Sequence, residues 1–175
     1  MQSNDLIQLL GNRLGIGNLN LDKNGLCRIK INQKIIIDFE EENNYLYMHS
    51  VIEDSVGKFN AAQLVALMRA HYLFNSVENA SFGINDNDQL CLFSRIAVPG
   101  ISEDVFFDIF ESFVAAYIEW KNKIDSNALT SGAQFTSGML LNEFEKSISN
   151  QMDNSSALPQ GAPTDSYFGR FSGNL

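Results

Sequence analysis

The sequence has few cysteines, few basic residues and no long apolar run. Its 175 residues include two cysteines and only 12 lysines and arginines against 21 acidic residues, so the net charge is −9. Two cysteines are too few for a disulfide framework. A chain this acidic lacks the positive footprint that nucleic acids and anionic membrane surfaces need. No apolar run approaches the roughly 20 residues that span a bilayer.

A secretion signal is not recognisable either. The first residues, MQSNDLIQLLGNR, have no basic segment, and their apolar run is short and broken. Apolar residues nevertheless make up 45% of the chain, which is typical of globular proteins. We therefore expect a soluble, acidic protein of the cytoplasm.

Motifs that carry chemistry are also missing. Neither His49 nor His71 has a cysteine or carboxylate at a metal-ligand spacing. The run Gly15-Ile16-Gly17 lacks the third glycine of a dinucleotide-binding fingerprint. No P-loop, GxSxG or HExxH motif occurs. The sequence predicts no enzyme, no metal site and no cofactor.

Local patterns predict three helices and five strands. Helical spacing of leucines indicates a helix over the first 14 residues, capped by Ser3 or Asn4 and ended by Gly15. Asn60 caps a second helix and Ser102 a long aromatic third one. Short spacings that favour antiparallel pairing predict strands over residues 26–31, 35–40, 45–52, 80–85 and 89–98. The fold class is therefore α+β, an antiparallel five-stranded sheet with three main helices (α-βββ-α-ββ-α).

The second predicted helix, residues 61–74, is apolar nearly all round. Such a helix must be covered on two sides. In one interpretation all of these residues are ordinary core. In the other they form a subunit interface, together with an exposed groove for a non-globular peptide.

The composition changes near residue 126. Ser, Thr, Asn, Gly and Pro supply 24 of the last 50 residues. We therefore divide the chain into a domain over residues 1–125 and an extension over 126–175. Within the extension, residues 138–152 have Leu140, Leu141, Phe144 and Ile148 at helical spacing, and we expect a flexible tail after them.

The order of these elements resembles the class I type III secretion chaperones, the family of the Tir chaperone. The resemblance covers about residues 3–124, and order, small size and acidic charge carry it together. The runs that match are Asn18-Leu19-Asn20-Leu21-Asp22, Ile35-Ile36-Ile37-Asp38, Leu46-Tyr47-Met48-His49, Ala80-Ser81-Phe82-Gly83-Ile84, and the aromatic helix that follows Pro99 and ends at Trp120.

The resemblance implies a cytoplasmic homodimer of a Gram-negative bacterium, with a role in virulence-associated secretion. It would bind the N-terminal non-globular segment of a secreted effector and keep it secretion-competent, without nucleotide or metal. It leaves the secretion-apparatus ATPase open as a further partner. The implied effector-binding residues are Leu6, Leu9, Leu10, Leu26 and Ile37. The implied dimer interface consists of Leu64, Leu67, Met68, His71, Phe74, Phe82 and Ile84.

Two other functions stay open at this point. A small homodimeric α+β regulatory or adaptor module would share the apolar helix but bind a folded protein partner. A small-molecule enzyme or carrier would need an enclosed pocket lined by convergent polar groups.

Overall fold

A computed structural model describes residues 1–72, 77 and 79–129 of the chain. The predicted helix over residues 138–152 and the predicted tail lie outside this part. The described elements confirm the α+β class and the order α-βββ-α-ββ-α. They are α1 (Ser3–Arg13), β1 (Leu26–Ile31), β2 (Ile35–Glu42), β3 (Tyr45–Glu53), a short 3-10 helix η1 (Val56–Lys58), α2 (Ala61–His71), β4 (Ser81–Ile84), β5 (Leu90–Ala97) and α3 (Glu103–Asp125).

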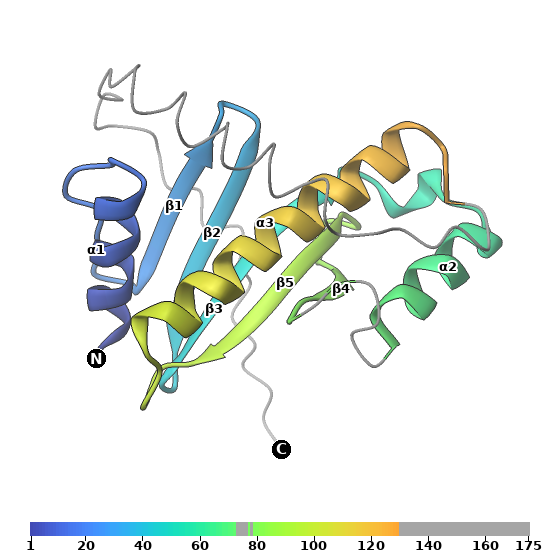
Figure 1. The fold of residues 1–175 in the computed structure, drawn as a ribbon. Helices are drawn as coiled ribbons and strands as arrows, with labels where there is room; N and C mark the ends of the chain where they lie inside the picture. Colours follow the sequence, from blue (N-terminus) through green and yellow to red (C-terminus); the bar gives the residue numbers. More distant parts are fainter. Residues whose placement is uncertain (73–76, 78, 130–175) are drawn as a thin grey trace.

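The five strands form one antiparallel sheet in the order β1-β2-β3-β5-β4 (Figure 1). The first three strands form a meander. Asn43 and Asn44, with φ of 51° and 66°, make the turn from β2 to β3. Positive φ at both positions suits the two-residue hairpin turn, whose twist matches that of the strands. Because β5 pairs with β3, the sheet ends in β1 on one side and β4 on the other.

One face of the sheet, the inner face, carries the core. Along β2 the side chains of Ile35, Ile37 and Phe39 are buried, while Ile36 between them points to the other face and is 41% exposed. Helix α3 crosses β3 and β5 on the inner face, and α1 packs beside it (Figure 1). The face that carries Ile36 is the outer face.

The helix ends match the sequence with two corrections. Gln2, rather than Ser3 or Asn4, caps α1, because Ser3 lies within the helix and donates a hydrogen bond to Glu41 at 2.8 Å. The predicted second helix reaches residue 74, but α2 ends at His71, and residues 73–76 lie outside the described part. The predicted Asn60 cap is confirmed, since its side chain accepts from the Gln63 backbone.

Helix α3 holds the layers together through its aromatic side chains. Phe110 stacks on Phe39 of β2 with ring centroids 6.4 Å apart. At the other end, Trp120 meets Phe82 of β4. Each of these rings is buried, and aromatic rings supply the largest share of apolar area in a core. The inner face is therefore closed from β2 to β4.

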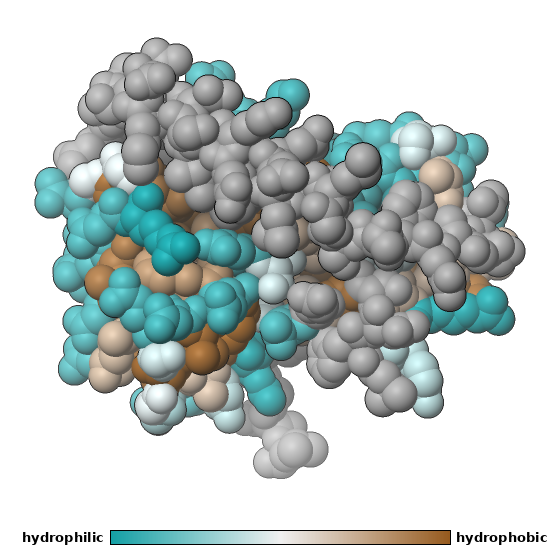
Figure 2. Space-filling model, viewed as in Figure 1, coloured by the Kyte–Doolittle hydropathy of each residue, from teal (hydrophilic) through white to brown (hydrophobic). Residues whose placement is uncertain are grey.

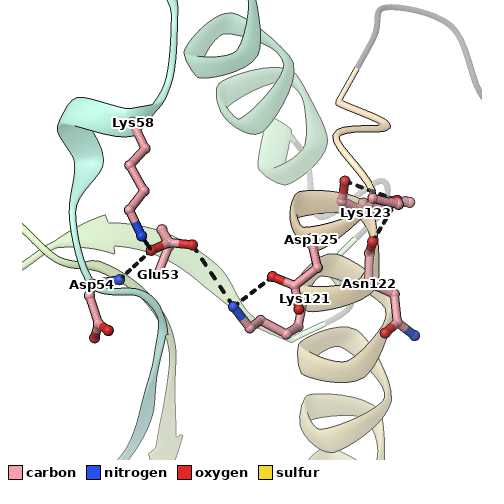
Figure 3. A network of polar contacts seen from close by, with 8 residues as sticks. Glu53, Asp54, Lys58, Lys121, Asn122, Lys123 and Asp125 are labelled. Carbon is pink, nitrogen blue, oxygen red and sulfur yellow. Dashed lines mark hydrogen bonds and ion pairs between the residues drawn. The ribbon is translucent and has the colours of Figure 1, made fainter.

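An ion-pair network fixes the end of β3 against α3 (Figure 3). Glu53 accepts hydrogen bonds from Lys58 of η1 and from the Asp54 backbone N–H. Its second oxygen lies 3.9 Å from Nζ of Lys121, which pairs with Asp125 at 2.8 Å. The hydrogen bond from Lys58 is the main reason that the pKa of Glu53 is lowered. The network thus positions the chain just before α2.

Candidate protein-binding surfaces

Helix α2 exposes an apolar stripe to solvent. Val65, Met68 and Tyr72 follow one another at spacings of three and four, which places them on one side of a helix. Val65 is 47% and Met68 54% exposed, and Tyr72 is also exposed. Together with the exposed Ile84 of β4, against which α2 packs, we call these residues the α2 stripe.

The opposite side of α2 belongs to the core. Leu67 and Ala70 are buried, and His71 lies 6.4 Å from the ring of Phe82. Phe82 in turn contacts Trp120 of α3. The helix is therefore covered on one side by its own domain, and the described residues leave its second side open.

The predicted dimer residues separate into these two sides. Met68 and Ile84 lie in the α2 stripe, while Leu67 and Phe82 are buried within the domain and cannot form a flat contact surface. Leu64 and His71 are half-buried. Phe74 lies outside the described residues.

Val65 and Tyr72 were not among the predicted interface residues. A helix that is apolar all round gives no polar face from which to orient it, so its sequence does not say which stripe meets the core. The signal that orients α2 lies elsewhere in the chain. It is the aromatic pair of Phe82 and Trp120, beside which His71 of α2 lies.

The predicted effector-binding residues divide in the same way. Leu6, Leu10 and Ile37 are fully buried in the core, so this packing leaves them no surface to offer to another chain. The physical reason is that α1 packs on α3 through the side that carries Leu6 and Leu10, and that Ile37 lies on the inner face of β2. Leu9 and Leu26 are partly exposed and remain candidates.

More partly exposed apolar residues lie close to α1. Ile16, Leu19 and Leu21, from the loop between α1 and β1, pack against the core without being buried by it. We call these three, together with Leu9 and Leu26, the N-terminal patch. Figure 2 shows brown hydrophobic areas breaking the teal surface on the side of the molecule where α1 lies. The sequence analysis did not assign the loop residues to a binding surface, because their spacing follows neither a helix nor a strand.

The edge strand β1 lies beside this patch. Its only partner in the described sheet is β2, so the backbone groups on its other side have no strand to pair with there. Such an edge can accept an extended segment of another chain. Cys27 of β1 faces inward, and burial raises the pKa of its thiol to about 11.

The histidines, cysteines and acidic residues of the described part are the side chains most often found in catalytic and metal sites. No group of three or more histidine, cysteine or acidic side chains in this part could hold a metal ion. Burial lowers the pKa of His49 and raises that of the Cys91 thiol, so at neutral pH burial disfavours the imidazolium and the thiolate. No helix of the described part has both the length and the apolar character of a membrane span.

Several crystal structures share this fold. The ExsC–ExsE complex aligns with a TM-score of 0.59 and 13% identity, covering 70% of this chain and 96% of that chain. The chaperone SycH of Yersinia pestis, in complex with a fragment of YscM2, gives 0.54 and 14%, covering 66% and 97%. The ExoU–SpcU complex of Pseudomonas aeruginosa gives 0.54 and 11%, covering 74% and 98%. At such low identities the likeness concerns the fold alone.

Sequence comparison identifies the family itself. No curated protein sequence matches the chain significantly. The sequence model of the Tir chaperone protein (CesT) family, however, matches residues 5–121. That range spans α1 to α3 without the extension. The chain therefore belongs to the Tir chaperone protein family.

Proposed function

We propose that this protein is a type III secretion chaperone that binds the N-terminal non-globular segment of a secreted effector and keeps it secretion-competent. The family match over residues 5–121 carries the proposal. One of the similar folds, SycH, is that of a type III secretion chaperone in complex with a fragment of YscM2. The N-terminal patch and the free edge of β1 supply a physical means of binding.

The mechanism is binding without chemistry. An unfolded segment has unpaired backbone groups and exposed apolar side chains. The edge of β1 can pair with the first, and Leu9, Leu19 and Leu26 can cover the second. Because ordering the segment costs conformational entropy, the contact must extend over a large surface. The role requires neither enzyme activity nor nucleotide, and it places the protein in the cytoplasm of a Gram-negative bacterium.

A homodimer through the α2 stripe is part of the proposal. A stable interface buries about 800 Å² on each partner and is anchored by a few apolar side chains. Val65, Met68 and Tyr72 offer such anchors, and a second copy offers the same stripe in a two-fold arrangement. Two N-terminal patches in one dimer would double the surface for one client.

The family match supports the proposed division of the chain into a chaperone unit and an extension. Residues 1–125 form the proposed chaperone unit, since the match ends at residue 121. Residues 126–175 form an extension that the family match does not cover. A secretion-apparatus ATPase is a further proposed partner of the loaded chaperone.

Co-purification tests the proposed function. The full chain is co-expressed with tagged proteins encoded near its gene, each in an intact form and in a form without its N-terminal segment. We expect a tight complex that forms without ATP, is lost with that segment and protects the segment from protease. Binding that survives the deletion would instead indicate an adaptor for a folded partner. Binding that requires nucleotide would contradict the chaperone function.

A further inference from the structure

The outer face of the sheet carries apolar residues that no described helix covers. All three helices lie on the inner face, because their buried contacts are with Phe39, Phe82 and the other inward side chains. On the outer face Ile36 is 41% and Phe93 38% exposed, and Val51 is half-buried. We call Ile36, Val51 and Phe93 the outer patch.

Gly83 of β4 leaves room for the Phe93 ring on the outer face. Phe93 of β5 points outward next to Gly83 of β4, and a Cβ atom at Gly83 would come within 3.1 Å of the Phe93 ring. Any side chain at residue 83 would therefore displace the ring. With glycine there, the phenyl ring lies against the backbone of β4 and widens the apolar surface of the sheet.

Charged side chains of both signs border the patch: Lys30 of β1 lies opposite Ile36, and Arg95 of β5 follows Phe93 on the same face. Asp38, Glu40 and Glu42 alternate with the buried Ile37 and Phe39, so they point to the outer face. Asp38 is paired with Arg28 of β1. Burial raises the pKa of Glu40, and the neighbouring Glu42 carboxylate raises it further. The patch itself thus suits the aromatic rings of a ligand, while Glu40 and Glu42, further along β2, suit a positive charge beside those rings.

The extension of the chain contains such a ligand. Residues 167–171 read Tyr-Phe-Gly-Arg-Phe, three aromatic residues around Arg170, which is one of only two basic residues in 130–175. The other basic residue, Lys146, lies beside Glu143 and Glu145 in the predicted amphipathic helix. Residues 167–171 combine three aromatic rings with no acidic side chain, so they suit both the apolar patch and the acids further along β2.

The length of the connecting segment permits this contact. The described part ends at Leu129, close to the start of α2, where Asn127 accepts a hydrogen bond from Gln63 at 2.9 Å. Residues 130–166 separate Leu129 from the aromatic run. A segment of this length reaches about 30 Å as a coil and over about 100 Å when extended. A tethered ligand within reach has an effective concentration of the order of millimolar, so a weak contact suffices.

We propose that residues 167–171 dock on the outer patch of the same chain, with the aromatic rings against Ile36, Val51 and Phe93 and Arg170 toward the acids of β2. The contact gives the extension a binding partner within its own domain. It also covers an apolar sheet face that a free chaperone would otherwise expose. It does not depend on any effector.

Photo-crosslinking in the full chain tests this contact. Benzoylphenylalanine replaces Phe168, the protein is irradiated without any client, and the linked peptides are identified by mass spectrometry. We expect links to the segments that carry Ile36, Val51 or Phe93. An equal mixture of ¹⁵N-labelled and unlabelled chains should give links within one chain. Links to α1 or α2, links between chains, or no links would overturn the proposal.

A pair of matched variants completes the test. Ile36→Lys removes an apolar contact and adds a charge that repels Arg170, so the yield of links should fall about tenfold, since an isoleucine contact is worth that much. Val105→Lys makes a similar change at a residue of α3 that is 49% exposed, and it should leave the yield unchanged. Circular dichroism confirms that both variants fold. Equal yields in both variants would overturn the proposal, and the proposed effector binding would be unaffected.

Discussion

The indole ring of Trp120 meets the ring of Phe82 edge-on, with centroids 5.1 Å apart and ring planes at 80°. This contact joins the end of α3 to the edge strand β4. Because His71 also lies beside Phe82, the position of α2 depends on the same contact. The exposed side of α2 is thus set by a pair of residues that are not on its surface.

Replacing Trp120 by alanine should therefore destabilise the whole domain. We expect a loss of about 3–5 kcal/mol in the free energy of unfolding, the range for large aromatic side chains in a core. Urea unfolding followed by circular dichroism measures this loss. The exposed Val105→Ala should stay within about 0.5 kcal/mol of the wild type. If Trp120→Ala also lost less than about 0.5 kcal/mol, the contact between α3 and β4 would not stabilise the domain.

Val65→Glu should convert a dimer into a monomer. The substitution places a carboxylate within the α2 stripe, where a second copy would bury it without a partner, at a cost of several kcal/mol. Light scattering and analytical ultracentrifugation report the mass. Val105→Glu is the matched control, since Val105 and Val65 are 49% and 47% exposed. A folded Val65→Glu variant that remains a dimer would exclude the α2 stripe as the interface.

Leu9→Asp and Leu19→Asp should weaken client binding while the domain stays folded. Both side chains lie in the N-terminal patch and are only partly buried, so a charge there remains hydrated in the free protein but not under a client. We expect at least about tenfold weaker binding by calorimetry, since burying a leucine contributes ~1.5–3 kcal/mol.

Leu6→Asp provides the contrast to these two variants. Leu6 is fully buried, so its replacement should unfold the domain rather than remove one contact. Thermal unfolding distinguishes the two effects. Unchanged affinity for the client in both Leu9→Asp and Leu19→Asp would show that the client binds outside the N-terminal patch.

Glu53→Gln should reduce stability at neutral pH and reduce it less at low pH. Lys58 lowers the pKa of Glu53 in the folded state, so the carboxylate stabilises the fold above the ordinary glutamate value of about 4.3. That contribution disappears as the pH falls through the lowered folded pKa. Urea unfolding at pH 7 and pH 3 should show the two proteins converging. A constant difference between them would exclude titration of Glu53 as the cause.

Local signals in the sequence were enough for most of the fold. The Asn60 and Ser102 caps and the Asn43–Asn44 turn act over a few residues, so the element order and its family resemblance could be predicted from them. The binding surfaces, which are the N-terminal patch and the α2 stripe, could not be predicted in this way. Whether Leu9 or Leu10 faces outward depends on where α1 sits against α3, and a spacing of three or four fits both.

The same limit applies to α2. Leu67 and Met68 are adjacent and similar in character, yet one is buried and the other exposed. The difference comes from the packing of α2 against β4, where His71 lies beside Phe82 and Phe82 meets Trp120 of α3. Neither residue type nor local spacing in the sequence reveals a contact between side chains that are so far apart in the chain.

The strand order also has a consequence for synthesis on the ribosome. The meander of β1, β2 and β3 can close as soon as it emerges, but β3 pairs with β5, and β5 follows η1, α2 and β4 in the chain. Because synthesis proceeds at roughly 5–20 residues per second, β3 remains unpaired on one side for a few seconds until β5 emerges. A nascent chain in this interval presents an open strand edge and an uncovered inner face. Neighbouring ribosomes on one message would bring such chains close together. The rate at which residues 54–97 are translated should therefore determine how much of the protein aggregates.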